Sequence, residues 1–269
     1  MTNYNFKGTI EVHVLLPMHV PIKLSFSDGS HFEIISADTE GVGPESSPKY
    51  GFRIGDIKAA SEKEAFLLTE EHLSTAAGYL SSFLQFRVNR KIEQMCYFEN
   101  GKPVTALSPI TAYLNNGPFP VKEIKIAELV KGWNDMPTDP ALIEAMRQLA
   151  DAKISEDKVR KFWHLYISCL LLAGGGANER ECIHQLLQPV GVAQLSKISR
   201  NPLYTETKSS AVVIRDYFSH SEDILTIDGE KPNLEELLQK HVFKLQYAIS
   251  QIVRERVIGL KSDDILIKL

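Results

Sequence analysis

Hydrophobic and polar residues alternate in the first part of the chain as they do in β-strands. The runs Thr9–Leu16, Ile22–Phe26 and His31–Ile35 show this alternation, and the segment 27–30 (SDGS) between the last two has the composition of a tight turn. We therefore expect the chain to begin with strands, the last two of which form a hairpin.

A helix and two further strands are expected after this region. Apolar residues recur at helical spacing over Glu70–Val88, with Thr69 as a candidate N-cap. Strands are expected at Ile92–Phe98 and Val121–Ile126, separated by an Asn-Gly turn. This pattern predicts a β-rich α+β domain.

The composition changes over Trp133–Pro140, where turn residues and helix-start residues occur together. We place a domain boundary here, which gives an α+β domain over 1–135 and an all-α domain over 136–269. Downstream the apolar period is close to 3.6 and predicts a bundle of four to five helices. Helices are expected over about Pro140–Ala152, from an N-cap at Ser155 to Leu172, over Glu181–Leu187, and from an N-cap at Asn233 to Ile258. A further helix is expected to contain the apolar run Ala211–Ile214, and its buried part should end near a polar opening.

Two glycine- and proline-containing segments are interpreted as connections. The triple glycine 174–176 lacks both the Gly-Lys-Ser/Thr ending of a phosphate loop and the spacing of a dinucleotide-binding loop, so it predicts a helix end. Asn201-Pro202 predicts a loop before the next helix.

Composition and charge restrict the classes of function. The 269 residues, 43% hydrophobic and 24% charged, are typical of a globular protein of two domains. A net charge of −4 provides no overall basic field, so any nucleic-acid site must be local. Lys197, Arg200, Lys208 and Arg215 lie close in sequence and form either such a local patch or a solvated basic loop.

The cysteines and the pattern of apolar segments predict the cellular compartment of the protein and whether it binds a metal. Three cysteines without a disulfide framework favour a reducing cytoplasm. Cys182 and His184 have no partner pair at ligand spacing, so we expect no metal and no cofactor. The pattern of a secretory leader is missing, and the apolar stretch around Leu165–Ala173 is too short to span a bilayer, so no membrane association is expected.

The chemistry-bearing segment of the chain is 215–220 (RDYFSH). Arg215 offers a permanently charged planar fork for phosphate oxygens, and His220 is a proton-transfer group near neutrality. Asp216 and His220 are four residues apart and share a face of an ideal helix, so the carboxylate would orient the imidazole and favour its protonated form. Arg215 and His220 are five apart and converge only at a distorted helix end or across two subunits. The combination suggests phosphodiester chemistry without a metal.

This segment, between an apolar helix and a long amphipathic one, resembles the R-x4-6-H signature of the HEPN superfamily. These all-helical domains occur in RNases of toxin-antitoxin, abortive-infection and CRISPR systems, and the resemblance covers about the last half of the chain. The preceding β-rich domain makes the arrangement similar to ApeA-like abortive-infection proteins. The resemblance implies a homodimer that juxtaposes two motifs through the helical domain, and a metal-independent endoribonuclease acting in anti-phage defence.

Residue roles follow from RNA cleavage by its own 2′-hydroxyl. His220 would transfer a proton, Arg215 would hold the non-bridging oxygens, and Asp216 would position His220. Tyr217 and Ser219 would add hydrogen bonds to phosphate or base, with Lys208 and Arg200 as further substrate-binding cations. The resemblance implies products with a 2′,3′-cyclic phosphate and a 5′-hydroxyl; tRNA is one candidate substrate.

Two other interpretations remain open. An arginine near an aspartate and a histidine on a helix also occurs as a surface ion-pair cluster. Some HEPN domains bind nucleotides or partners without cutting, which would make this a module for dimerisation or scaffolding. Arg215 and His220 would be dispensable only in such a module, not in the nuclease. Asp216 replaces an asparagine found in many HEPN nucleases, and no tyrosine stands two residues after His220, so silencing by adenylylation of such a tyrosine is not supported.

Overall fold

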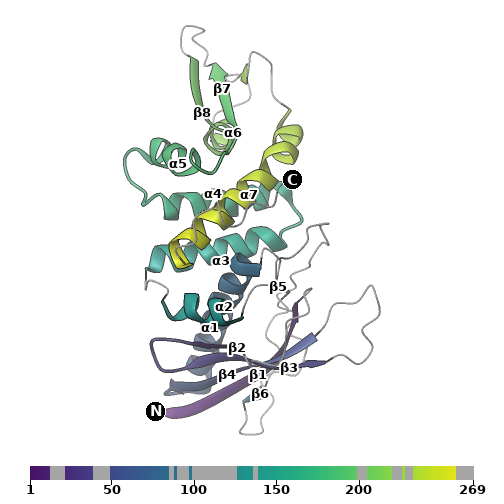
Figure 1. Cartoon of the computed structure of the whole chain (residues 1–269), viewed down its shortest axis with the longest axis vertical. Helices are drawn as coiled ribbons and strands as arrows, with labels where there is room; N and C mark the ends of the chain where they lie inside the picture. Colours follow the sequence, from purple (N-terminus) through teal and green to yellow (C-terminus); the bar gives the residue numbers. More distant parts are fainter. Residues whose placement is uncertain are drawn as a thin grey trace. The chain divides into compact units, whose positions relative to one another are not determined.

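The chain divides into two compact units, Met1–Pro137 and Thr138–Leu269. The computed structural model shown in Figure 1 describes residues 1–12, 22–38, 49–84, 88–89, 97–98, 126–135, 139–198, 205–219, 226–227 and 233–258. Strands and helices are both present in these ranges, so the fold is a mixed α+β fold, as the sequence predicts. Each unit is described separately below.

An antiparallel sheet is the main feature of the first unit. Its strands are β1 (Thr2–Val12), β2 (Ile22–Ser25), β3 (His31–Asp38), β4 (Lys49–Ala59), β5 (Val88–Asn89) and β6 (Tyr97–Phe98). Their order is β2-β3-β4-β1-β5, and β6 pairs with β1. Alternate side chains of the central strands are buried, among them Phe6, Phe32 and Phe52, and the rings of Phe32 and Phe52 stack with centroids 5.6 Å apart. The predicted hairpin between β2 and β3 is confirmed: the Phe26 N–H donates to Ser30 O at 2.8 Å, and Gly29 takes a φ of 88°.

Helix α1 (Glu62–Leu84) begins well before the expected residue, so Thr69 is not its cap. Thr69 is buried inside the helix and donates its hydroxyl to Ala65 O at 2.7 Å. Ser61 caps instead, accepting from the Glu64 N–H at 3.2 Å, while the Glu64 carboxylate accepts from the Ala60 N–H at 2.7 Å. Such a reciprocal arrangement satisfies N–H groups that the first helical turn leaves without partners.

Helix α2 (Ile126–Asn134) is joined to the sheet hairpin by Trp133. The Trp133 indole N–H donates to Ser25 O at 2.6 Å, and the ring meets Phe26 and Tyr79 edge-on at 5.2 and 4.9 Å. Of the strands expected over 92–98 and 121–126, only 97–98 is a described strand, and Ile126 belongs to α2. The rest of both predictions lies outside the described residues.

The second unit contains the helices that the sequence predicts, with shifted ends. They are α3 (Pro140–Ile154), α4 (Lys158–Leu172), α5 (Glu179–Leu187), α6 (Ser210–Ser219) and α7 (Leu234–Ile258). Asn233 caps α7 as expected, accepting from the Glu235 N–H at 3.0 Å. Asp157, not Ser155, caps α4 by accepting from the Arg160 N–H at 2.7 Å. The triple glycine ends α4 with positive φ angles, 83° at Gly174, which confirms its interpretation as a helix end.

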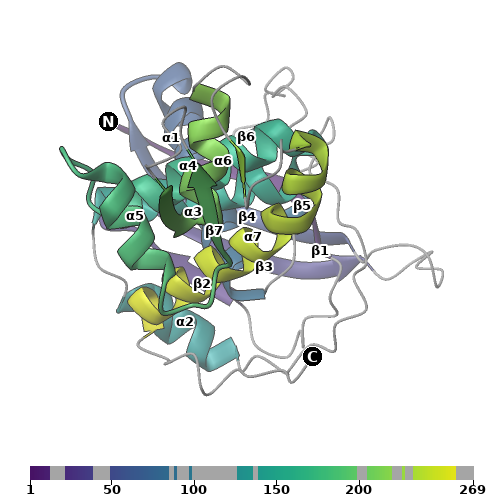
Figure 2. The same cartoon turned by 90° about the horizontal axis from the view of Figure 1, so that it is seen from above.

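The second unit is not all-α, which corrects the expectation from sequence. Strands β7 (Gln194–Ile198), β8 (Thr205–Ser209) and β9 (Thr226–Ile227) form an antiparallel sheet in the order β8-β7-β9. Figures 1 and 2 show β7 beside α6, and β8 runs directly into α6. The sequence did not indicate β8 because its residues (TETKS) include no apolar side chain, so hydrophobic alternation is missing.

Candidate functional site

Helix α6 is held firmly by its apolar first half. Ala211, Val212, Val213 and Ile214 are each no more than 1% exposed, and the Ser210 N–H donates to Ala193 O at 2.8 Å beside β7. Because this segment is buried, it fixes the position of the rest of α6, from Arg215 to Ser219. His220, the expected proton-transfer residue, and Arg200 lie outside the described residues.

Asp216 is the centre of a buried ion-pair cluster. Its side chain is 1% exposed, and its Oδ2 atom accepts from Nζ of Lys197 on β7. Its Oδ1 atom lies 3.2 Å from Nε of Arg180 on α5 and 3.2 Å from Nη1 of Arg215 on α6. One carboxylate thus collects three cations from three elements. A buried carboxylate requires such compensation, because desolvation of an unpaired charge is costly.

A second group of ion pairs surrounds this centre. Lys197 also lies 3.3 Å from Glu206 on β8, and Lys208 lies 2.5 Å from Glu181 and 3.6 Å from Glu206. The hydrogen bond from Lys208 lowers the pKa of the Glu181 carboxyl, and the same bond is the main cause of the raised pKa of Lys208. Lys208, which the sequence suggests as a substrate contact, is therefore already paired with carboxylates.

The two arginines of the cluster have fewer carboxylate partners than the two lysines. Asp216 is the only acidic partner of Arg180 and Arg215 within the described ranges, and both use the same oxygen. Their side chains are 45% and 24% exposed. A guanidinium group has five N–H donors in a fork that matches the oxygens of phosphate. The guanidinium groups of Arg180 and Arg215 therefore lie next to each other and have further N–H donors that can bind an anion.

The residues after Asp216 differ in burial and in packing. Tyr217 is 7% exposed and Ser219 is exposed at the end of α6. The Phe218 ring stacks on Phe162 of α4 with centroids 5.6 Å apart and lies at the same distance from Trp163. The expected contacts of Tyr217 and Ser219 with phosphate or base remain predictions.

Sequence spacing missed several members of this site. Arg180 belongs to no motif and lies in the first turn of α5, so nothing in the sequence connected it with Asp216. Tyr166 on α4 was also missed; its hydroxyl donates to Glu179 Oε1 at 2.7 Å, and burial is the main cause of its raised pKa. His184 lies next to the cluster, where its Nδ1 atom accepts from the Ser209 N–H at 3.1 Å.

Comparisons of the chain with protein-family models, with curated proteins and with solved structures found no match. Over the part of the chain that the structure describes, no three His, Cys, Asp or Glu side chains are placed to hold a metal ion. None of the described helices is long and apolar enough to cross a membrane.

Proposed function

We propose that the second unit is a HEPN-type endoribonuclease that cleaves RNA without a metal. The observation that carries this proposal is the arginine pair of the Asp216 cluster, which supplies guanidinium groups for an anion next to the R-x4-H segment. Arg215 and Arg180 hold the non-bridging oxygens of the scissile phosphate, where negative charge increases during the reaction. Arg180 is thereby added to the residues that the motif suggests.

The reaction needs two proton transfers. The 2′-hydroxyl attacks the adjacent phosphorus and loses its proton to a base, the P–O5′ bond breaks, and the leaving 5′-oxygen takes up a proton. The products are a 2′,3′-cyclic phosphate and a 5′-hydroxyl. His220 supplies one of the two transfers, and in a homodimer the His220 of a second motif supplies the other. This assignment rests on the resemblance in sequence.

Asp216 acts as a positioning residue in this proposal. Its oxygens fix the directions of both guanidinium groups, because Oδ1 contacts each of them at 3.2 Å. Preorganised cations cost no reorganisation when charge develops on the phosphate. The first unit would sense a trigger, hold RNA or restrain the dimer, and anti-phage defence is the corresponding biological role.

The test is cleavage of total tRNA and of a single-stranded RNA in EDTA, with the chemistry of the product ends determined. We expect cyclic-phosphate ends from the wild type and a loss of about a hundredfold or more in H220A and R215Q. The R180Q variant is the sharper probe, because only the structure connects Arg180 with the motif. R256Q, which removes an exposed arginine of α7, is the matched control. Equal cleavage by wild type, H220A and R180Q would refute the proposal.

A scaffolding role is the second candidate function. It is supported by the pairing of Lys197 and Lys208 with Glu206 and Glu181, since a cluster that satisfies its own charges also suits a purely structural purpose. In that case R215Q and R180Q would change the stability or the molecular mass of the protein in solution, and no variant would affect the ends of any RNA.

A further inference from the structure

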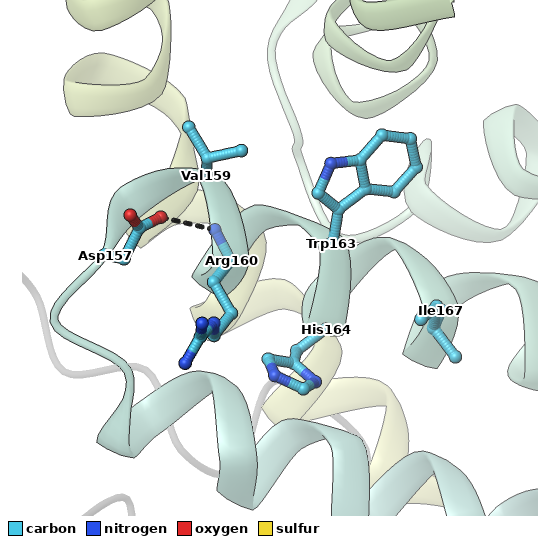
Figure 3. A pocket seen from close by; sticks show the side chains of 6 residues that line it. All are labelled: Asp157, Val159, Arg160, Trp163, His164 and Ile167. Carbon is cyan, nitrogen blue, oxygen red and sulfur yellow. Dashed lines mark hydrogen bonds between the residues drawn. The ribbon is translucent and has the colours of Figure 1, made fainter.

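An open depression of about 700 Å³ runs along the outer face of α4. It is lined by Asp157, Val159, Arg160, Trp163, His164 and Ile167. Figure 3 shows Trp163 extending from one side of the helix and Arg160 and His164 from the other. Its lining combines apolar surface with a few polar groups, a combination that is typical of ligand sites.

Trp163 connects the depression with the helix that carries the candidate site. Its ring lies 5.7 Å from Phe162, 6.0 Å from Tyr166 and 5.6 Å from Phe218, the residue two positions after Asp216. These contacts hold the indole in place while leaving it partly exposed. A fixed, partly exposed indole is a suitable surface for stacking a planar ring.

Arg160 provides a cation that is free to bind. Its side chain is exposed, and its guanidinium group has no ion-pair or hydrogen-bond partner among the residues that the structure describes. Lys158, two residues earlier, is by contrast paired with Glu235 at 2.6 Å. An unpaired guanidinium that lines the same depression as an indole is suited to a phosphate of a nucleotide whose base stacks on that indole.

His164 has a defined hydrogen-bonding state. The Gln148 amide nitrogen donates to Glu144 Oε1 at 2.9 Å, which directs the amide oxygen toward Nδ1 of His164 at 2.7 Å. Because an amide oxygen only accepts, Nδ1 donates to it, and this tautomer leaves Nε2 as an acceptor. The depression therefore offers a stacking surface, a cation and a hydrogen-bond acceptor.

We propose that this depression binds one unstacked nucleotide of a single-stranded RNA. The base lies against Trp163, a neighbouring phosphate contacts Arg160, and an N–H or O–H group of the nucleotide donates to Nε2 of His164. The inference rests on the proposed function in taking RNA as the substrate, and it places a binding subsite beyond the scissile phosphate.

A second copy of the chain fits this face less well. The exposed aliphatic side chains of α4 are Val159 and Ile167, at 37% and 38%. They supply little of the roughly 800 Å² per partner that a stable interface usually buries. Such a contact would also remove Arg160 from water. The same stretch of a second copy offers only one carboxylate to pair with it, that of Asp157, and this carboxylate already caps the helix.

The experiment measures binding separately from cleavage. A 2′-O-methylated single-stranded oligoribonucleotide, which lacks the attacking hydroxyl, is titrated into the full chain while tryptophan emission is recorded. Trp163 should be quenched, and W163F should abolish the quenching, since the remaining Trp133 is 5% exposed. R160Q should weaken binding by roughly 5- to 100-fold, the range of a single base or phosphate contact. K158Q removes the same charge from the same helix turn without lining the depression, and should have a much smaller effect.

The outcomes separate this inference from the proposed function. Quenching that depends on Trp163 and Arg160 supports the subsite even if no RNA is cleaved. Cleavage without quenching, or equal binding by R160Q and K158Q, overturns the subsite and leaves the nuclease proposal standing. The subsite is also overturned if the wild type binds no RNA. If RNA does not quench the wild type and W163F changes the molecular mass of the protein in solution, the face is an interface for self-association instead.

Discussion

Replacement of Asp216 by asparagine should destabilise the second unit strongly. The substitution keeps size and one acceptor oxygen but leaves Arg180, Lys197 and Arg215 without the charge that pairs them. Removal of one partner from a buried ion pair costs about 3–5 kcal/mol. Both arginines are partly exposed and solvent screens them, and Lys197 retains Glu206 at 3.3 Å, so we expect a loss near the lower end, about 3 kcal/mol.

The assay is urea unfolding followed by Trp163 fluorescence in a W133F background, so that the signal reports the second unit. A loss of about 3 kcal/mol corresponds to a fall of roughly 10 °C in Tm for a unit of this size. E255Q, which removes an exposed acid of α7, should change stability by less than about 0.5 kcal/mol.

A double substitution tests the assignment of the cause. If the stranded Lys197 charge dominates the loss, D216N/K197M should be more stable than the sum of the single effects predicts, with a coupling of about 1–3 kcal/mol. A loss below about 1 kcal/mol in D216N, or simple additivity with K197M, would show that the buried carboxylate does not organise the cluster.

Three further predictions concern other parts of the chain. Burial, with Lys240 and Lys244 nearby, lowers the pKa of His241, so the unfolded chain gains a proton below about pH 6.5 while the folded chain does not. The second unit should therefore lose stability as the pH falls from that value toward the lower folded pKa, and H241L should flatten this slope in Tm. In the first unit, a Cβ at Gly55 would lie 2.7 Å from Cε1 of His31, so G55A should cost about 1–3 kcal/mol in urea unfolding, and no change would contradict the close contact. K208Q should cost less than about 1 kcal/mol, because its partner Glu181 is 45% exposed; if Lys208 also contacts RNA, the salt dependence of binding should fall by about one charge.

Local signals in the sequence predicted the helices of the second unit because their ends depend on neighbouring residues. Asn233 caps α7, and the glycines after α4 adopt the positive φ angles that end a helix. The same reasoning misplaced the start of α1, since Thr69 resembles a cap by residue type but serves inside the helix. Residue type alone does not distinguish a hydroxyl that accepts from an N–H at a helix start from one that donates to a carbonyl in the interior.

Contacts between distant segments could not be predicted from spacing. Lys197 and Asp216 are 19 positions apart and meet because the β7–β8 hairpin returns the chain to α6. Lys197 was recognised as one of several basic residues, but its burial was not, since solvated and buried lysines have the same sequence signature. Arg180 enters the cluster from α5, and no periodicity relates it to the motif.

The proposed phosphate site would couple the stability of the second unit to anion binding. Two guanidinium groups share one oxygen of Asp216, so repulsion between them is only partly compensated in the free protein. An anion that reaches both arginines would relieve this repulsion, and a ligand that binds only the folded state raises its stability in proportion to the logarithm of ligand concentration. The proposed phosphate site therefore implies that inorganic phosphate raises the Tm of the wild type and has less effect on R180Q. Sodium chloride at equal ionic strength would screen the repulsion without occupying the forks, so an identical rise with both salts would favour simple screening over a built phosphate site.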